Sequence, residues 1–248
     1  MARASQRQGT LSIELLAILM VVFFAIFTQS LTGFGSSLLS MPLLVPLLGI
    51  RIAAPLVALV TLISEAVLVV RYRASLNIRR VWRLAIASLL GIPLGVLALA
   101  WLDEQITTAV LGIVVLAYAS YAIFGRRLPR LRWSGWGFGA GFLAGILGGA
   151  YNTSGPPVIL YADSQRWPRD EFKGNLQGFF LISSLLVAAG HVWRQNLTPI
   201  VWNYLLLSLV PIILGLWAGL TLDKRLNAMA FRKLVLALLV VLGISLLL

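Results

Sequence analysis

Apolar residues occur along this chain in long uninterrupted runs that are separated by short polar or charged connections. Runs of about 17 to 25 apolar residues are long enough for a helix to cross a ~30 Å hydrocarbon core, and they recur throughout. The strands of a membrane barrel would instead alternate over segments of about 10 residues. The pattern therefore predicts an all-α polytopic membrane protein.

Apolar length and the breaks between runs define the segments. We predict long helices at residues 11–31, 52–71, 81–101, 105–124, 134–149, 172–190, 199–221 and 229–248. Two further apolar stretches, 35–49 and 153–163, are short, and 15 helical residues reach only about 22 Å. Each is therefore predicted to be a half-depth or barely spanning element. The first run resembles a secretion signal, but no small-residue cleavage site follows it, so we predict a membrane helix.

Basic residues gather in four connections, at residues 71–83, 125–132, 164–173 and 221–233. If both short elements cross the membrane, making about ten segments, these connections lie on one side and hold most of the 20 Lys and Arg residues. The positive-inside rule then places them in the cytoplasm and both termini outside, in a bacterial-type inner membrane. We interpret the mixed charges of residues 163–173 as a solvated loop.

The two halves of the chain resemble each other. WRLAIASLLGIPLGVLALAWLD (82–103) aligns without a gap with WNYLLLSLVPIILGLWAGLTLD (202–223), which pairs Gly95 with Gly215. Five crossings is an odd number, so two successive units insert in opposite directions. We predict two inverted five-helix repeats, residues 1–124 and 134–248, joined by a basic cytoplasmic linker at 125–133.

The short elements follow unusual polar stretches at matching places in the two halves. TGFGSSLLSMP and GGAYNTSGPPVILY align at a shift of 115, which pairs Gly33 with Gly148 and Pro42 with Pro157. Polar backbone rich in glycine and proline is tolerated at membrane depth only where it faces protein or a water-filled cavity. We therefore predict interrupted helices that meet at a shared site near the membrane midplane.

Each break would begin a helix whose first N–H groups have no partner within the helix. Those donors, together with the positive end of the helix dipole, form an anion site. An alternative is that the glycines only allow helices to cross closely. The candidate substrate-binding residues at the breaks are Thr32, Gly35, Ser36, Ser37, Pro42, Tyr151, Asn152, Thr153, Ser154, Gly155 and Pro157. Gln177 is favoured over Asn175 as a further residue facing the cavity.

Glu65 is an acidic residue inside the predicted helix 52–71, and its repeat partner is Ser184. A carboxylate within the membrane is costly and is a candidate for coupling a proton or sodium ion to substrate movement. An alternative is that Glu65 reaches the interface or pairs with an arginine such as Arg71.

Composition excludes several classes of function. The chain has no cysteine and one histidine, which excludes thiolate and histidine-rich metal sites, so no metal and no cofactor are expected. The net charge of +12 lies in short loops without interleaved aromatics, so we expect no nucleic-acid partner. We expect no catalytic residues and no enzymatic activity.

The paired break segments and the tryptophan-led helices at 82 and 202 resemble the sulfite exporter TauE/SafE family of membrane anion transporters over residues 20–245. The resemblance implies transport of sulfite, sulfonates or other small organic anions, often outward. It also implies as site elements Gly33, Gly35, Pro42, Gly148, Gly149 and Pro157. Two serines, Ser36 and Ser37, stand where the family has a second glycine.

The sequence thus predicts a secondary transporter, an exporter of a small anion such as sulfite, a sulfonate or another organic oxyanion, working by alternating access. The alternatives are an anion channel and an intramembrane enzyme that acts on an anionic lipid headgroup. The expected partners are the small anionic substrate and the lipid bilayer, and a homodimer is left open.

Overall fold

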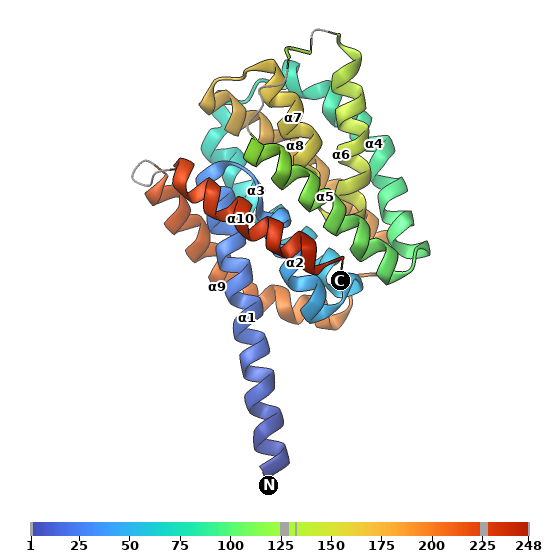
Figure 1. Ribbon diagram of the computed structural model, residues 1–248, viewed down its shortest axis with the longest axis vertical. Coiled ribbons are helices and arrows are strands. Elements are labelled where there is room, and N and C mark those ends of the chain that lie inside the picture. Colours follow the sequence, from blue (N-terminus) through green and yellow to red (C-terminus); the bar gives the residue numbers. More distant parts are fainter. Residues whose placement is uncertain (1, 125–128, 132, 224–227, 248) are drawn as a thin grey trace.

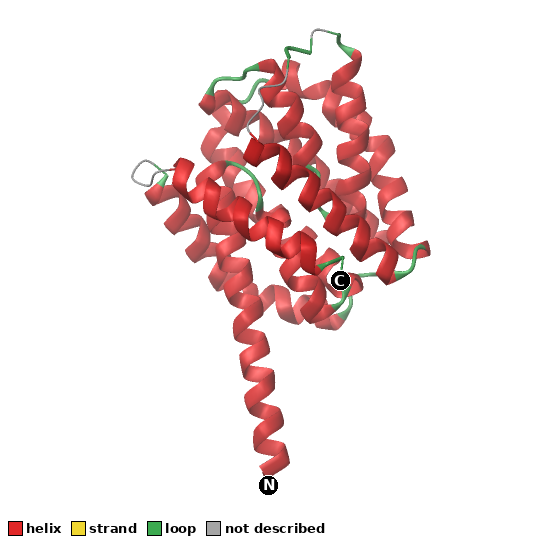
Figure 2. Cartoon of the chain, in the orientation of Figure 1, coloured by secondary structure: helices red, strands yellow, loops and turns green. Residues whose placement is uncertain are grey.

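The computed structural model describes residues 2–124, 129–131, 133–223 and 228–247. The regular elements in these ranges are helices, without a strand (Figure 2). In chain order they are α1 (Ala2–Thr32), α2 (Ser36–Leu48), α3 (Ile50–Tyr72), the 3₁₀ turn η1 (Arg73–Ser75), α4 (Ile78–Trp101), α5 (Glu104–Phe124), α6 (Gly135–Tyr151), α7 (Gly155–Gln165), α8 (Arg169–Trp193), α9 (Pro199–Leu222) and α10 (Ala228–Ser245). The predicted all-α class is confirmed, and the described residues form ten α-helices.

Six helices are long and apolar enough to cross a membrane: α1, α3, α4, α5, α8 and α9. The protein is therefore a multi-pass membrane protein. The helices that begin at the two breaks are much shorter, with 13 residues in α2 and 11 in α7. The membrane-spanning part of α1, Ile13–Thr32, agrees with the predicted helix at 11–31. The helix itself begins at Ala2, and its first half extends beyond the bundle (Figure 1).

Helices of the first half of the chain pack mainly against helices of the second half. The most extensive contacts pair α4 with α6, α1 with α9, α3 with α8 and α5 with α10. Glycines let the backbones of α4 and α6 approach closely, since a Cβ added to Gly95 would overlap the Ile146 carbonyl and one added to Gly149 would overlap the Ile92 carbonyl. The two halves therefore form one interlocked bundle.

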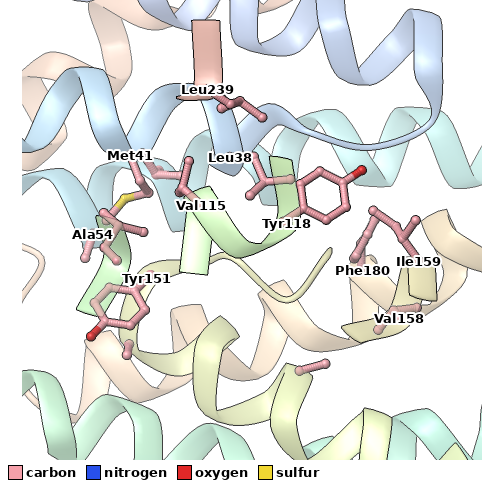
Figure 3. Packing of buried hydrophobic residues seen from close by; sticks show 14 of the residues in the cluster. Leu38, Met41, Ala54, Val115, Tyr118, Tyr151, Val158, Ile159, Phe180 and Leu239 are labelled. Carbon is pink, nitrogen blue, oxygen red and sulfur yellow. The ribbon is translucent and has the colours of Figure 1, made fainter. Parts of the chain in front are cut away.

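The first turns of the two short helices are covered by the long helices. Figure 3 shows Leu38 and Met41 of α2 packed among side chains of α3, α5, α6 and α10, with Ile159 of α7 beside Phe180 of α8. Leu38, Met41 and Ile159 are at most 2% exposed. The starts of α2 and α7 are therefore enclosed by protein.

Ion pairs hold several of the basic connections together at one end of the bundle. Arg80 of α4 pairs with Glu171 of α8 at 3.0 Å, and Arg169 pairs with Asp223 after α9 at 3.0 Å. At the other end, the carboxylate of Glu104 accepts a hydrogen bond from Ile50 N at 2.9 Å. The predicted linker falls partly outside the described residues, at 125–128 and 132.

Candidate functional site

The first break separates α1 from α2 and is built on two glycines. Gly33 has φ +90° and Gly35 has φ +98°, a left-handed conformation that residues with a Cβ rarely adopt. No side chain caps the start of α2. The backbone N–H groups of its first turn therefore have no helical acceptor and are open to a ligand.

Two side chains of α8 hold the first break in place. Lys173 Nζ donates to the Leu31 carbonyl at 2.9 Å, and Gln177 Nε2 donates to the Gly33 carbonyl at 2.8 Å. A cation at the carbonyl end of α1 also complements the negative end of that helix dipole. The C-terminus of α1 is thus satisfied by residues that lie more than 140 positions away in the sequence.

Lys173 is buried, contrary to its predicted place in a solvated loop. It is 3% exposed and its ammonium pairs with Asp223 Oδ1 at 2.8 Å, in a network that also includes Tyr72 and Arg169. The loop interpretation failed because charge spacing along the sequence does not show that α8 begins at Arg169 and carries Lys173 inward.

The second break separates α6 from α7 and closes largely through its own residues. Asn152 adopts φ 54°, Asn152 N donates to the Gly148 carbonyl at 2.8 Å, and Thr153 N donates to the Leu147 carbonyl at 3.2 Å. This is the pattern of a helix ended by a left-handed residue. The Asn152 amide then donates to the Ala54 carbonyl of α3 at 2.7 Å.

The two breaks meet at a small internal cavity. It is lined by Gln29, Gly35, Ser36, Ser37, Leu38, Glu65, Asn152, Thr153, Ser154, Gly155 and Phe180. The start of α2 and the start of α7 both contribute to this lining, and neither is capped by a side chain. The predicted convergence of the break residues is therefore present in the structure. At about 20 Å³ the cavity admits a single water molecule, so an oxyanion needs further opening.

Glu65 forms part of the cavity wall. It is 5% exposed, and its carboxylate contacts the Ser184 hydroxyl and the Gln29 side chain. Gln29 in turn accepts a hydrogen bond from Ser64 at 3.0 Å. Glu65 does not pair with Arg71, which was the alternative prediction, because the Arg71 guanidinium lies over the Tyr72 ring.

The other predicted site residues lie around the cavity without lining it. Gln177 binds the Gly33 carbonyl, Thr32 borders a separate apolar cavity beyond Gly35, and Gly149 packs against α4. The remaining members of this outer group are Gly33, Pro42, Gly148, Tyr151 and Pro157. They shape and support the breaks.

Besides Lys173, sequence reasoning did not include three residues that line the cavity or contact its wall. Leu38 and Phe180 line the cavity, but nothing distinguishes them from other apolar residues in the sequence. The sequence singled out Ser184 only as the repeat partner of Glu65. That pairing was the one sequence feature that could have predicted their contact. Within the described ranges, no group of three His, Cys, Asp or Glu residues could hold a metal ion.

The wall of the cavity offers amide and hydroxyl donors without a cation. Among the described residues, Glu65 supplies its one ionisable side chain. Uncapped helix N-termini bind anions through backbone N–H groups and the helix dipole. Such a site suits a small oxyanion that is bound through neutral hydrogen bonds and released again.

Comparison with known proteins agrees with this geometry. The family described as "Sulfite exporter TauE/SafE" matches residues 18–246. The chain is also 25% identical over 248 residues to a protein of Cupriavidus necator named "Probable sulfite/organosulfonate exporter TauE", covering 97% of this chain and 96% of that one. No solved structure matches significantly. Because the family match covers most of its length, this chain belongs to the sulfite exporter TauE/SafE family.

Proposed function

We propose that this protein is a secondary transporter that exports a small oxyanion, such as sulfite, a sulfonate or another organic oxyanion. The substrate binds in the cavity between the starts of α2 and α7. The observation that carries the proposal is the convergence of two uncapped helix N-termini, with the hydroxyls of Ser36, Ser37 and Ser154, on one buried cavity. Family membership supports an export function.

The donors in the cavity suit an anion that has to leave again. Backbone N–H groups and hydroxyls give directional hydrogen bonds, whereas a buried lysine or arginine would hold the anion as an ion pair. Pro156 and Pro157 remove two N–H groups from the first turn of α7, so α2 supplies more of the donors. The predicted binding set therefore centres on Ser36 and Ser37.

An inverted repeat is supported by the way equivalent elements pack. The pairing of α4 with α6 has its counterpart in the pairing of α9 with α1. Gly95 lies against the α6 backbone, and its repeat partner Gly215 lies against the α1 backbone at Phe23. Glu65 contacts its own repeat partner, Ser184, and two equivalent residues touch in this way only near a twofold axis. The proposed axis therefore passes beside the cavity.

Alternating access follows from this arrangement. One group of helices rocks against the other around the shared site, opening it to each side in turn. A cavity of about 20 Å³ corresponds to a closed state between the two open ones. The basic connections are proposed to face the cytoplasm of a bacterial-type inner membrane, with both termini outside.

The test uses the full chain in lipid vesicles that contain sulfite. We expect sulfite efflux above that of protein-free vesicles, and faster efflux when sulfite is also present outside, because a carrier exchanges its substrate. Efflux that external sulfite does not accelerate would indicate a channel. Absence of efflux and of any thermal stabilisation by sulfite, sulfonates, sulfate or carboxylates would overturn the proposal, since a ligand of the native state raises its stability.

A matched pair of variants on α2 connects transport to the cavity. Ser37→Ala removes a hydroxyl that lines the cavity, whereas Ser40→Ala removes a buried hydroxyl one turn away that does not line it. We expect Ser37→Ala to weaken sulfite binding by about tenfold, the cost of one lost hydrogen bond to a charged ligand, and Ser40→Ala to leave it unchanged. If both variants changed sulfite binding equally, the cavity would not be the binding site.

A further inference from the structure

In the part of the chain that the structure describes, Glu65 is the one ionisable residue that lines the cavity, so it shares this small space with the proposed anion. It belongs to α3, is 5% exposed, and lines the cavity together with the starts of α2 and α7. A carboxylate and an oxyanion repel each other strongly in a closed cavity of low dielectric constant. One of the two has to carry a proton when both are present.

The hydrogen bonds around Glu65 are compatible with two protonation states. The Ser184 hydroxyl contacts Glu65 Oε2 and also the Phe180 carbonyl, the latter at 2.9 Å. A hydroxyl has one proton to donate and can also accept. It can donate to an ionised Glu65, or it can donate to Phe180 while a protonated Glu65 donates to it. The site therefore remains satisfied whether or not Glu65 carries a proton.

The elements packed against α3 bring no charged side chain to Glu65. On α8, Lys173 pairs with Asp223 and His191 contacts Asn196. Of the other ionisable residues of α8, Glu171 pairs with Arg80, Arg169 pairs with Asp223, and Asp170 stands in the first turn. The residues of α1, α2 and α8 that line the cavity with Glu65 or contact it are uncharged: Gln29, Ser36, Ser37, Leu38, Phe180 and Ser184. Tyr204 of α9 packs in an apolar cluster, Arg73 of η1 follows the end of α3, and Glu14 of α1 is exposed. No fixed charge of the described residues therefore holds Glu65 in its ionised form.

From this geometry we infer that Glu65 is the proton-binding residue of the anion site, and that the anion-loaded carrier holds it protonated. The inference rests on the proposed function and adds the identity of the coupled ion. Anion and proton bind together and cross together, and Glu65 gives up its proton after the anion leaves. For a singly charged anion the proton and the anion together carry no net charge. The loaded site and the empty, ionised site then have the same charge, so the membrane potential does not drive the complete transport cycle. Efflux follows the concentration gradient of the anion and is faster when the loading side is acidic.

The experiment compares wild-type protein with Glu65→Gln in vesicles loaded with sulfite. Glutamine keeps the shape and the hydrogen bonds of a protonated carboxyl and cannot ionise. Sulfite efflux is measured from about pH 6 to pH 8, at zero potential and with a potential imposed by potassium and valinomycin. Sulfite itself titrates over this range, and that contribution is common to both proteins, so the difference between them isolates Glu65.

Between about pH 6 and pH 8, we expect the decrease in efflux to be about tenfold larger for the wild-type protein than for Glu65→Gln. The reason is that only the wild-type protein loses a proton at residue 65. At acid pH, the imposed potential should accelerate Glu65→Gln and leave the wild-type protein unaffected. Identical pH profiles and identical responses to potential would overturn the inference while leaving the transport function intact. No sulfite efflux by wild-type protein would instead contradict the proposed function.

Two further variants keep the inference testable if Glu65→Gln does not fold. Glu65→Asp retains a titratable group and should keep the steep pH profile at a lower rate. Ser184→Ala removes the hydroxyl that serves both protonation states, and should shift the midpoint of the pH profile while sulfite still binds. A flat profile in Glu65→Asp, or an unshifted midpoint in Ser184→Ala, would contradict the role assigned here.

Discussion

The two helix breaks serve the same cavity but are held in different ways. The first break depends on α8, whose Lys173 and Gln177 donate to the carbonyls of Leu31 and Gly33. The second break closes through its own backbone and contributes one amide, that of Asn152, to α3. The position of the first break therefore depends on distant packing, whereas that of the second is fixed mainly by local sequence.

The largest expected effect comes from removing the cation under the first break. Lys173→Met deletes charged hydrogen bonds to the Leu31 carbonyl and to Asp223, and should lower the free energy of unfolding by roughly 3 kcal/mol. Arg169→Met is the control, since Arg169 pairs with the same carboxylate but its side chain is 64% exposed. That loss should not exceed about 1 kcal/mol. Denaturant unfolding in lipid bicelles measures the free energy of unfolding of both variants. Similar losses would mean that Lys173 stabilises the first break no more than an exposed ion pair does.

The second expected effect concerns the glycines. Gly33→Ala places a Cβ at φ +90° and 3.0 Å from Lys173 Cγ, so it should destabilise the protein by about 2 kcal/mol. Gly155→Ala, at the start of α7, meets only ordinary contacts of 3.5 Å and beyond. Its free energy of unfolding should stay within about 0.5 kcal/mol of wild type. If Gly155→Ala lost more stability than Gly33→Ala, the second break and not the first would require glycine.

The smallest expected effect concerns Asn152. Asn152→Ala loses the hydrogen bond to the Ala54 carbonyl and places alanine at φ 54°, and should cost about 1.5 kcal/mol. Asn152→Gly loses the same hydrogen bond but tolerates the conformation, so it should cost less than Asn152→Ala. The difference between the two variants measures the conformational part. Equal losses would show that the amide contact dominates, and a larger loss in the glycine variant would contradict the conformational cost assigned to alanine.

The division into helices could be predicted because membrane depth fixes how long an apolar run has to be. The two short helices were predicted at residues 35–49 and 153–163 and lie at Ser36–Leu48 and Gly155–Gln165, since glycine and proline mark their starts. The start of α1 was less well defined, because no strong signal separates its polar first turns from its apolar part.

The part of the candidate site that could be predicted from the sequence is the part that is duplicated in the two halves of the chain. Matching breaks in two repeats indicated that Ser36, Ser37, Asn152 and Ser154 would converge, and they line one cavity. The support of the first break could not be foreseen, because Lys173 reaches Leu31 across 142 positions of sequence and resembles a loop residue when it is considered locally. Contacts of this kind follow from packing and not from spacing.

The proposed transport function requires that an oxyanion binds between the starts of α2 and α7. Selenite has the shape and charge of sulfite, and its selenium atom can be located by anomalous diffraction from crystals of the full chain. We expect one buried anomalous peak in the cavity, placed so that the selenite oxygens accept hydrogen bonds from Ser36, Ser37 and Ser154. A peak confined to the basic connections, such as the groove beside Arg79 and Arg80, with none in the cavity, would contradict it.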